Sequence, residues 1–227
     1  MNESEFIEAN KHKSVIDLAL LLSKKSELDS AFILTQINGI QKAKNKLPEF
    51  YNSQNIVYPT KLSMEQCSSE KTGFYKSKVI KGETLIDLTG GFGIDSFYFA
   101  KQFKQVTYVE RNQELFEIVK SNFKKLKAHN IDLVNSTAEE FLQTTNKKVD
   151  IVYIDPSRRN ENQRVFKLDE CTPNIIELAP AIFQIADKIL VKTAPLLDIK
   201  QSLKDLANVT KVWAVSVDND CKEVLYL

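Results

Sequence analysis

The sequence contains little cysteine and histidine, and each shortage excludes a class of site. The three cysteines, Cys67, Cys171 and Cys221, form no C-x-x-C pair, which argues against a structural zinc site and against a disulfide framework. The two histidines, His12 and His129, leave almost nothing for Ser-His-Asp or metallo-hydrolase chemistry. We therefore expect no metal site.

The sequence also lacks a long apolar run and an excess of charge. No apolar segment approaches the ~18 residues that a membrane-spanning helix needs, and the N-terminus is polar and acidic without a signal-peptide core. The 227 residues carry a formal net charge of +1, so affinity for nucleic acid has to come from a local patch or a partner. We expect a cytoplasmic protein without membrane contact, large enough for one α/β domain and a smaller segment.

Residues 1–65 have a helical pattern that differs from the rest of the chain. Apolar positions within residues 1–47 predict helices with a buried stripe, the second of them over residues 30–46. Residues 48–63 contain two prolines and are expected to be irregular. The expected stripe includes Ile16, Leu20 and Leu21. We expect a helical N-terminal segment or small domain over residues 1–65, serving either as a substrate-binding lobe or as a cap over the sheet.

A further helix is expected over residues 70–80, with Ser68 or Ser69 as its cap. Residues 68–72 precede the next conspicuous motif by only this helix. They are equally compatible with a contact to a ligand there and with a plain capping motif.

From residue 84 onward, strand patterns alternate with helix patterns. This alternation predicts a mostly parallel sheet with helices on both faces. The last two strands are separated only by residues 218–220, and so short a connection forces an antiparallel hairpin. We expect an α/β fold over residues 66–227 with a seven-stranded, mostly parallel sheet and one antiparallel strand. The expected strands are 84–88, 106–110, 131–134, 149–154, 188–192, 209–217 and 221–227, and the expected helices are 94–104, 112–127, 137–143, 174–186 and 198–207.

A glycine-rich turn, DLTGGFGID, follows the first of these strands. Glycines at this place let the backbone approach a ligand closely, and the next helix begins with free N–H groups. Asp87 ends the first strand and Glu110 ends the second, about 20 residues after the turn, which is the spacing of a carboxylate that binds ribose hydroxyls. The simpler alternative is a glycine-rich turn without a ligand.

Two features of this turn disfavour a dinucleotide. The G-x-G-x-x-G pattern fails because Ser96 occupies the third glycine position, and Asp87 at the mouth of the turn repels a pyrophosphate. A ligand with a ribose and a positive charge but no phosphate fits better. The sequence therefore favours S-adenosylmethionine over NAD.

The stretch VDIVYIDPSRR ends the fourth strand with a carboxylate and a proline. Asp155 and the carbonyl of Pro156 form two acceptors in rigid geometry, which can hold both N–H groups of an exocyclic amine and aim its lone pair at a methyl donor. The alternative for Asp155 is a helix or turn cap.

Arginine is scarce, yet three of the four arginines lie within residues 158–164. Arg158 or Arg159 is suited to stack on a flat base or to hold a phosphate. Salt bridges to neighbouring acids are an equal alternative, with Glu161, Asp169 and Glu170 as candidates.

These motifs together resemble the class I, Rossmann-like S-adenosylmethionine-dependent methyltransferases over about residues 66–227. DLTGGFG resembles the family's D-x-x-x-G-x-G loop, Glu110 its ribose-binding acid, and DPSR its amine-methylating D-P-P-[YF] motif. The resemblance implies catalytic roles for Asp155, Pro156 and Ser157 and substrate binding by Arg158 and Arg159. It implies cofactor binding by Asp87, Thr89, Gly90, Gly91, Gly93, Asp95, Glu110, Arg111, Thr137 and Ala138.

A narrower resemblance concerns a bacterial methyltransferase family in which a THUMP-like domain follows the catalytic domain. LSMEQCSSEKTGFYK, DLTGGFGID, YIDPSRR, KTAPLLD and NDCKEVL carry this likeness. THUMP domains bind RNA, so the resemblance implies an RNA substrate such as tRNA or rRNA. The seventh predicted strand reaches Leu227, so we expect the catalytic domain only.

The motif after the fourth strand departs from the family pattern, because Ser157-Arg158 replaces the proline-aromatic pair. DPSR is also similar to the D-P-P-R of RNA uridine C5 methyltransferases, which use a cysteine after the fifth strand. Lys192-Thr193-Ala194-Pro195 occupies that place, so C5 chemistry is rejected.

We therefore expect a methyltransferase that modifies an amine of an RNA base. The alternatives are methylation of a small molecule or protein, and a cofactor-binding, RNA-associated module without catalysis.

Overall fold

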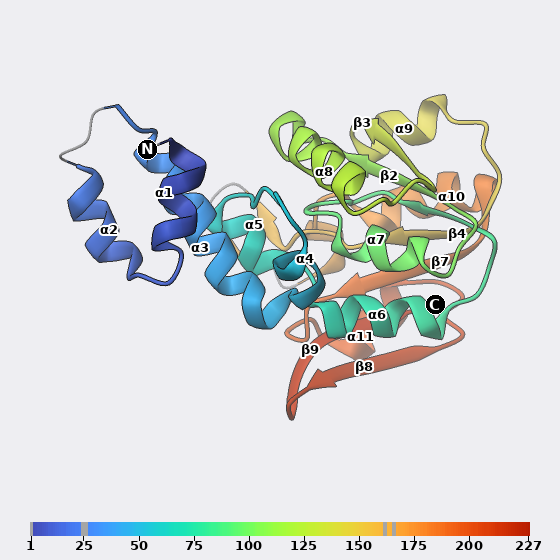
Figure 1. Ribbon diagram of the computed structural model, residues 1–227. Coiled ribbons are helices and arrows are strands. Elements are labelled where there is room, and N and C mark those ends of the chain that lie inside the picture. The colour runs from blue at the N-terminus through green and yellow to red at the C-terminus, as the bar shows by residue number, and fades with distance from the viewer. Residues whose placement is uncertain (1, 24–26, 161–162, 165–166) are drawn as a thin grey trace.

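The computed structural model describes residues 2–23, 27–160, 163–164 and 167–227, and for residues 159–166 it describes no side chain. Figure 1 shows a central sheet flanked by helices, with the first helices standing to one side. No helix in the described part of the chain is long and apolar enough to cross a membrane.

The sheet has seven strands in the order β3-β2-β1-β4-β7-β9-β8. β9 is antiparallel to both of its neighbours, and the other pairings are parallel, so the predicted sheet with one antiparallel strand is confirmed. The strands are β1 (Thr84–Asp87), β2 (Gln105–Glu110), β3 (Ile131–Asn135), β4 (Val149–Ile154), β7 (Ala186–Thr193), β8 (Val212–Val217) and β9 (Asp220–Tyr226). A separate two-stranded ribbon joins β5 (Arg159–Asn160) and β6 (Gln163–Arg164).

The β8–β9 hairpin explains why the last strand runs antiparallel to its neighbours. Asp218 and Asn219 both have positive φ, at 53° and 62°, which a tight two-residue hairpin turn requires and which Asp and Asn tolerate. The short Asp-Asn turn therefore sends the last strand back between β7 and β8.

Helices cover both faces of the sheet because its central strands are apolar on both sides. Leu85 and Ile151 belong to one buried cluster together with residues of α7 and α8, whereas Ile86 and Val152 belong to a second cluster with residues of α9 and α10. Neighbouring residues of a strand point to opposite faces, so this division follows from the pleat. The helices are α6 (Glu70–Val79), α7 (Ile94–Ala100), α8 (Gln113–Lys125), α9 (Ala138–Thr144), α10 (Ile175–Ile185) and α11 (Ile199–Asp205), with a 3₁₀ turn over Leu168–Glu170.

The N-terminal helices divide between two cores. Phe6, Leu18, Leu22, Ile33 and Ile37 form a small core of their own, while Ala43, Leu47, Phe50, Tyr58 and Met64 join the core of the sheet domain. The helices are α1 (Glu3–Asn10), α2 (Val15–Leu22), α3 (Ser30–Lys46), α4 (Pro48–Asn52) and α5 (Lys61–Gln66). The proposed division after residue 65 thus falls at the end of α5, and it stays a prediction.

Two expectations for this region were wrong. Residues 48–63 are not wholly irregular, because Pro48 occupies the first turn of α4, where its missing N–H is harmless, and Thr60 caps α5. The predicted apolar stripe is buried only in part, since Ile16, Leu20 and Leu21 are exposed. The short helix α2 has too many apolar residues to bury them all against α3.

Candidate active site

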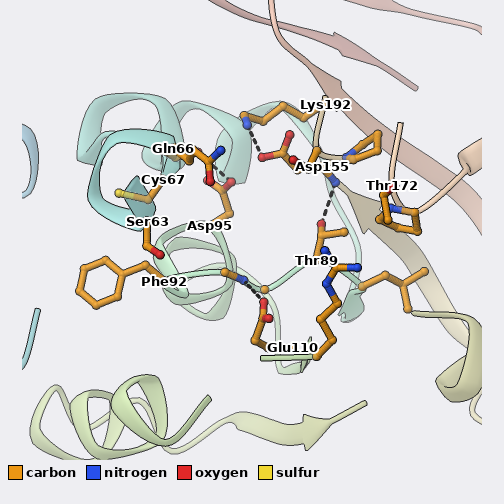
Figure 2. Close-up of a pocket in the computed structure, with 18 of the residues that line it drawn as sticks. Ser63, Gln66, Cys67, Thr89, Phe92, Asp95, Glu110, Asp155, Thr172 and Lys192 are labelled. Carbon is orange, nitrogen blue, oxygen red and sulfur yellow. Dashed lines mark hydrogen bonds and ion pairs between the residues drawn. The ribbon is translucent and has the colours of Figure 1, made fainter. Parts of the chain in front are cut away.

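A cavity of about 800 Å³ opens at the carboxyl ends of the parallel strands. This is the edge at which open α/β sheets bind ligands. The loops after β1, β2, β4 and β7 supply much of its lining, and α5 forms part of the wall through Leu62, Ser63 and Gln66. Figure 2 shows Thr89, Glu110, Asp155 and Lys192 around this space.

The glycine loop after β1 is held against the ring of Tyr108 on β2. A Cβ atom at Gly90 would lie 2.1 Å from the Tyr108 ring, so a larger residue does not fit there without displacing a buried aromatic. The Tyr108 hydroxyl donates to the carbonyl of Gly91 at 2.7 Å, and Gly91 has a φ of +53°. The two adjacent glycines therefore serve different needs: close approach at Gly90 and a left-handed backbone at Gly91.

Glu110 contacts the glycine loop, and its binding of ribose hydroxyls stays a prediction. The N–H of Gly91 donates to its Oε2 at 2.8 Å, and the N–H of Asn112 donates to its Oε1 at 2.7 Å. Glu110 and the neighbouring Arg111 line the cavity. Two backbone donors thus orient the carboxylate at the end of β2, and Figure 2 shows the contact from the glycine loop.

Asp87 lies beneath the glycine loop and not at its mouth, where the sequence placed it. Its side chain is fully buried, and it accepts hydrogen bonds from the Ser96 hydroxyl at 2.6 Å and the Thr89 N–H at 3.0 Å. Burial raises its pKa to about 7, although the bond from Ser96 acts in the opposite direction. Asp87 therefore supports the loop from below, and cofactor contact by its side chain stays a prediction.

Gly93 and Thr137 also stand apart from the cavity lining, while their neighbours Gly91 and Ala138 belong to it. Gly93 has a φ of +77° and is the N-cap of α7, and a Cβ atom there would lie 2.7 Å from Phe123. Thr137 caps α9, because its hydroxyl accepts the Glu140 N–H at 3.1 Å. Both residues shape the walls of the site through local backbone structure.

Asp95 lines the cavity but is nearly buried within a polar cluster. The Ser68 and Tyr153 hydroxyls donate to its Oδ2 at 2.8 and 2.7 Å, and the Lys76 ammonium lies 3.2 Å from its Oδ1. Burial by itself would raise the pKa of Asp95, but Lys76, Lys192 and these hydroxyls more than offset it and hold the pKa below its usual value. Asp95 therefore presents a charged carboxylate at this wall.

The stretch 68–72 contains both a helix cap and a cavity-lining residue, and its contact to a ligand stays a prediction. Ser69 caps α6 by accepting the Thr72 N–H at 3.2 Å, whereas Ser68 lines the cavity and bonds to Asp95. The helix cap and the cavity-lining residue are therefore adjacent in the sequence.

Lys76 and Glu223 were missed by the sequence analysis. Lys76 on α6 is completely buried, and its Nζ lies 2.6 and 2.8 Å from the two carboxylate oxygens of Glu223 on β9. A signal did exist, because helical spacing places Lys76 beside Gly73 and Ser77 on the buried face of α6. A charged side chain on such a face indicates a buried partner.

The loop after β4 brings the predicted catalytic residues to the cavity. The Asp155 N–H donates to the Thr89 hydroxyl at 2.7 Å, which ties this loop to the glycine loop. Pro156 and Ser157 line the cavity, and the backbone of Ser157 pairs with that of Thr172. Asp155 forms an ion pair through Oδ2 with Lys192 at the end of β7, a partner that the sequence analysis did not find.

Arg158 lines the same end of the cavity. Its Nη1 is buried and, among the described residues, has no hydrogen-bond partner. The expected alternative, a salt bridge from Arg158 to Asp169 or Glu170, is absent from the described part of the chain. The side chain of Arg159 and the whole of Glu161 lie outside the described residues.

The matches to known proteins agree with this architecture. A "putative methyltransferase from Porphyromonas gingivalis W83" of known structure is 29% identical and superposes with a TM-score of 0.82 over 99% of this chain and 56% of that chain. A solved structure of "a putative methyltransferase complexed with SAH" is 16% identical, with a TM-score of 0.50 over 63% of this chain and 44% of that chain, and it shares the fold.

Among curated proteins, the ribosomal RNA small subunit methyltransferase J of Francisella tularensis subsp. novicida is 28% identical over 116 residues. The match covers 47% of this chain and 46% of that protein, so the similarity spans about half of each. The profile of the family described as "Conserved hypothetical protein 95" matches residues 54–178, which is more than half of the chain and includes the glycine loop, Glu110 and the β4 loop. The chain therefore belongs to the Conserved hypothetical protein 95 family.

Proposed function

We propose that the chain is an S-adenosylmethionine-dependent methyltransferase that modifies an amine nitrogen of an RNA base. One observation carries this proposal: a single cavity joins the glycine loop and Glu110 at one end to Asp155 and Pro156 at the other. The proposed ribose-binding carboxylate follows β2 and the proposed amine-binding acceptor pair follows β4, on either side of β1. The Thr89–Asp155 hydrogen bond links the loop after β1 to the loop after β4.

The residues at the glycine-loop end fit the cofactor. Glu110 is oriented to accept the ribose hydroxyls, and Leu115 and Ala138 offer apolar surface beside it for the adenine. The methionine end would lie toward Asp95, whose carboxylate favours a cationic ligand. S-adenosylmethionine supplies a methyl group on a sulfonium, so that the C–S bond breaks as the N–C bond forms and the electron pair stays on sulfur.

At the other end, Asp155 and the carbonyl of Pro156 bind the two N–H groups of the acceptor amine. This holds the nitrogen lone pair toward the methyl donor, which is catalysis by positioning and needs no strong base. The nitrogen then releases its proton to water or to the Asp155 carboxylate. Ser157 belongs to the same rigid loop, because its backbone is paired with Thr172.

Three features support RNA as the substrate. Arg158 lines the acceptor end of the cavity, where a guanidinium is suited to a phosphate or a base edge. The Francisella tularensis relative is named as a ribosomal RNA methyltransferase. The resemblance to methyltransferases with a THUMP-like domain also implies an RNA substrate. Because α5 lines the cavity, we assign the N-terminal segment a role in substrate binding.

Calorimetric titration with S-adenosylhomocysteine, with NADH in parallel, tests the cofactor. We expect micromolar binding of S-adenosylhomocysteine and none of NADH, because Ser96 replaces the third glycine of a dinucleotide site. Binding of NADH alone would contradict the proposal.

Transfer of a labelled methyl group tests the acceptor. The acceptors are unmodified small-subunit rRNA and tRNA transcripts, with total cell protein and a small-metabolite extract as the alternatives. Labelled RNA nucleosides methylated on a base nitrogen are expected. Label only in protein or small molecules would overturn the RNA assignment, and tight cofactor binding without any transfer would favour the non-catalytic module.

A further inference from the structure

Lys192 occupies an unusual place for a lysine. It is the penultimate residue of β7, and its side chain is only 12% exposed. Its ammonium forms an ion pair with Oδ2 of Asp155. Among the described residues, no hydrogen bond reaches the other oxygen, Oδ1 of Asp155. The pair therefore occupies one carboxylate oxygen and leaves the second one to the cavity, which both residues line (Figure 2).

A buried set of charges stands behind this pair. Glu223 and Asp95 also interact electrostatically with Lys192, and Lys76 lies between these two carboxylates at 2.6 and 3.2 Å. Burial acts to lower the pKa of Lys192, but Asp155, Glu223 and Asp95 outweigh burial and raise the pKa above its usual value. Lys192 is therefore a permanent cation at neutral pH and cannot serve as the proton acceptor.

The same geometry defines what Lys192 does to Asp155. A carboxylate held by a fixed ammonium cannot rotate freely, because rotation would break the ion pair. An Oδ1 atom with a fixed direction is a good acceptor for an N–H group. This suits catalysis by positioning, in which the carboxylate has to orient the amine rather than deprotonate it first.

We propose that Lys192 is a positioning residue, which fixes the Asp155 carboxylate so that Oδ1 receives the acceptor amine, and that Lys76, Asp95 and Glu223 hold Lys192 in place. This inference rests on the proposed function. It assigns a role to a side chain from the end of β7, which the motif after β4 does not include.

Other charged and titratable groups also face this region, so the test has to isolate Lys192 from them. Asp87 lies on β1, Tyr153 on β4 and Arg158 in the loop after β4. Lys46 lies on α3, and Cys67 and Cys171 lie in the segments before α6 and α10.

The test compares Lys192→Met, Lys192→Arg and a control, Lys188→Met, which removes an exposed lysine from the same strand. In each variant bound to S-adenosylhomocysteine, the carboxyl ¹³C signal of Asp155 is recorded by NMR at neutral pH. Values of kcat and KM are measured with S-adenosylmethionine and the RNA transcript that accepts methyl from the wild-type chain. Lys192→Met removes the contact that fixes Oδ2 of Asp155, so the signal should move and kcat should fall about tenfold or more. KM for the RNA and affinity for S-adenosylhomocysteine should stay near their wild-type values.

Lys192→Arg keeps the charge and should leave the Asp155 signal and kcat near their wild-type values, as should Lys188→Met. An Asp155 signal that is the same in Lys192→Met and wild type would overturn the inference. If Lys192→Met does not fold, a displaced signal in the folded Lys192→Arg would overturn it as well. The NMR measurement needs no turnover, so an absence of methyl transfer would count against the proposed function and not against the contact between Lys192 and Asp155.

Discussion

The two ends of the cavity are built from different interactions. At the glycine-loop end, backbone N–H groups and a tyrosine hydroxyl hold Gly91 and Glu110 in place. At the acceptor end, ion pairs are added to the backbone contacts, with Lys192 on Asp155 and, behind it, Lys76 on Glu223. Backbone N–H groups fix the Glu110 carboxylate at one end, whereas a lysine side chain from another strand fixes the Asp155 carboxylate at the other. Under the proposed function, the first end binds the cofactor and the second end orients the acceptor.

The largest effect is expected behind the acceptor end, from Lys76→Met. Removing the fully buried ammonium leaves Glu223 and Asp95 without their shared cation, which should lower the free energy of unfolding by about 3–5 kcal/mol. Urea denaturation measures this change. Lys71→Met, on the exposed side of the same helix, should change stability by less than about 0.5 kcal/mol. Equal stability of the two variants would show that the buried charges are not needed for folding.

Asp155→Ala should lower turnover without lowering affinity for the cofactor. We expect a loss of about 10²–10³-fold in turnover, the scale found when one positioned polar contact to the reacting groups is removed. Affinity for S-adenosylhomocysteine, measured by calorimetry, should stay close to that of the wild type, because Glu110 and the glycine loop are untouched. Asp169→Ala, an exposed acid downstream, is the control. Equal losses of turnover and affinity would mean that Asp155 binds the cofactor.

Glu110→Ala should give the opposite pattern. It removes the acceptor of the Gly91 N–H and the expected partner of the ribose hydroxyls, so affinity for S-adenosylhomocysteine should fall about ten- to a hundredfold. At saturating cofactor, turnover should recover. Glu114→Ala, an exposed acid at the start of α8, should bind like the wild type. A Glu110→Ala chain with unchanged affinity would remove the basis for calling this end the cofactor end.

The smallest effect is expected from Asp87, in the way the free energy of unfolding changes with pH. Its pKa is about 7 in the folded chain against 3.8 for an unperturbed Asp, because it is buried. Between these values the folded chain binds more protons than the unfolded chain, so this group makes the free energy of unfolding fall as pH rises. Asp87→Asn removes this contribution. The wild type should therefore lose stability relative to Asp87→Asn from pH 4 to pH 7 in urea denaturation, and parallel curves would show that Asp87 is already ionised at low pH.

Local motifs predicted the fold and the glycine-loop end well. Strand and helix periodicity, together with the short Asp218–Asp220 connection, indicated the seven-stranded sheet and its antiparallel strand. Glu110 was found because its spacing from the glycines is a property of one βαβ unit. Asp87 was misplaced because a strand-end carboxylate can point above or below the loop, and only packing against Ser96 decides which.

The acceptor end was predicted only in part, since its partners are far apart in the chain. Asp155 is visible in a motif, but Lys192, Glu223 and Lys76 lie in a strand, a second strand and a helix whose sequences carry no shared spacing. Their contact depends on the strand order, which puts β7 between β4 and β9. It also depends on the packing of α6, which brings Lys76 to Glu223 on β9.

By itself, therefore, the sequence determined the alternation of elements, the glycine turn and the acid and proline that end β4, because each depends on neighbouring residues or on a single turn of chain. Only the tertiary structure decided which charges face one another, that Asp87 is buried, and that α5 lines the cavity. The physical reason is that burial and ion pairing act between surfaces brought together by the sheet, and their strength depends on distances that no local pattern specifies.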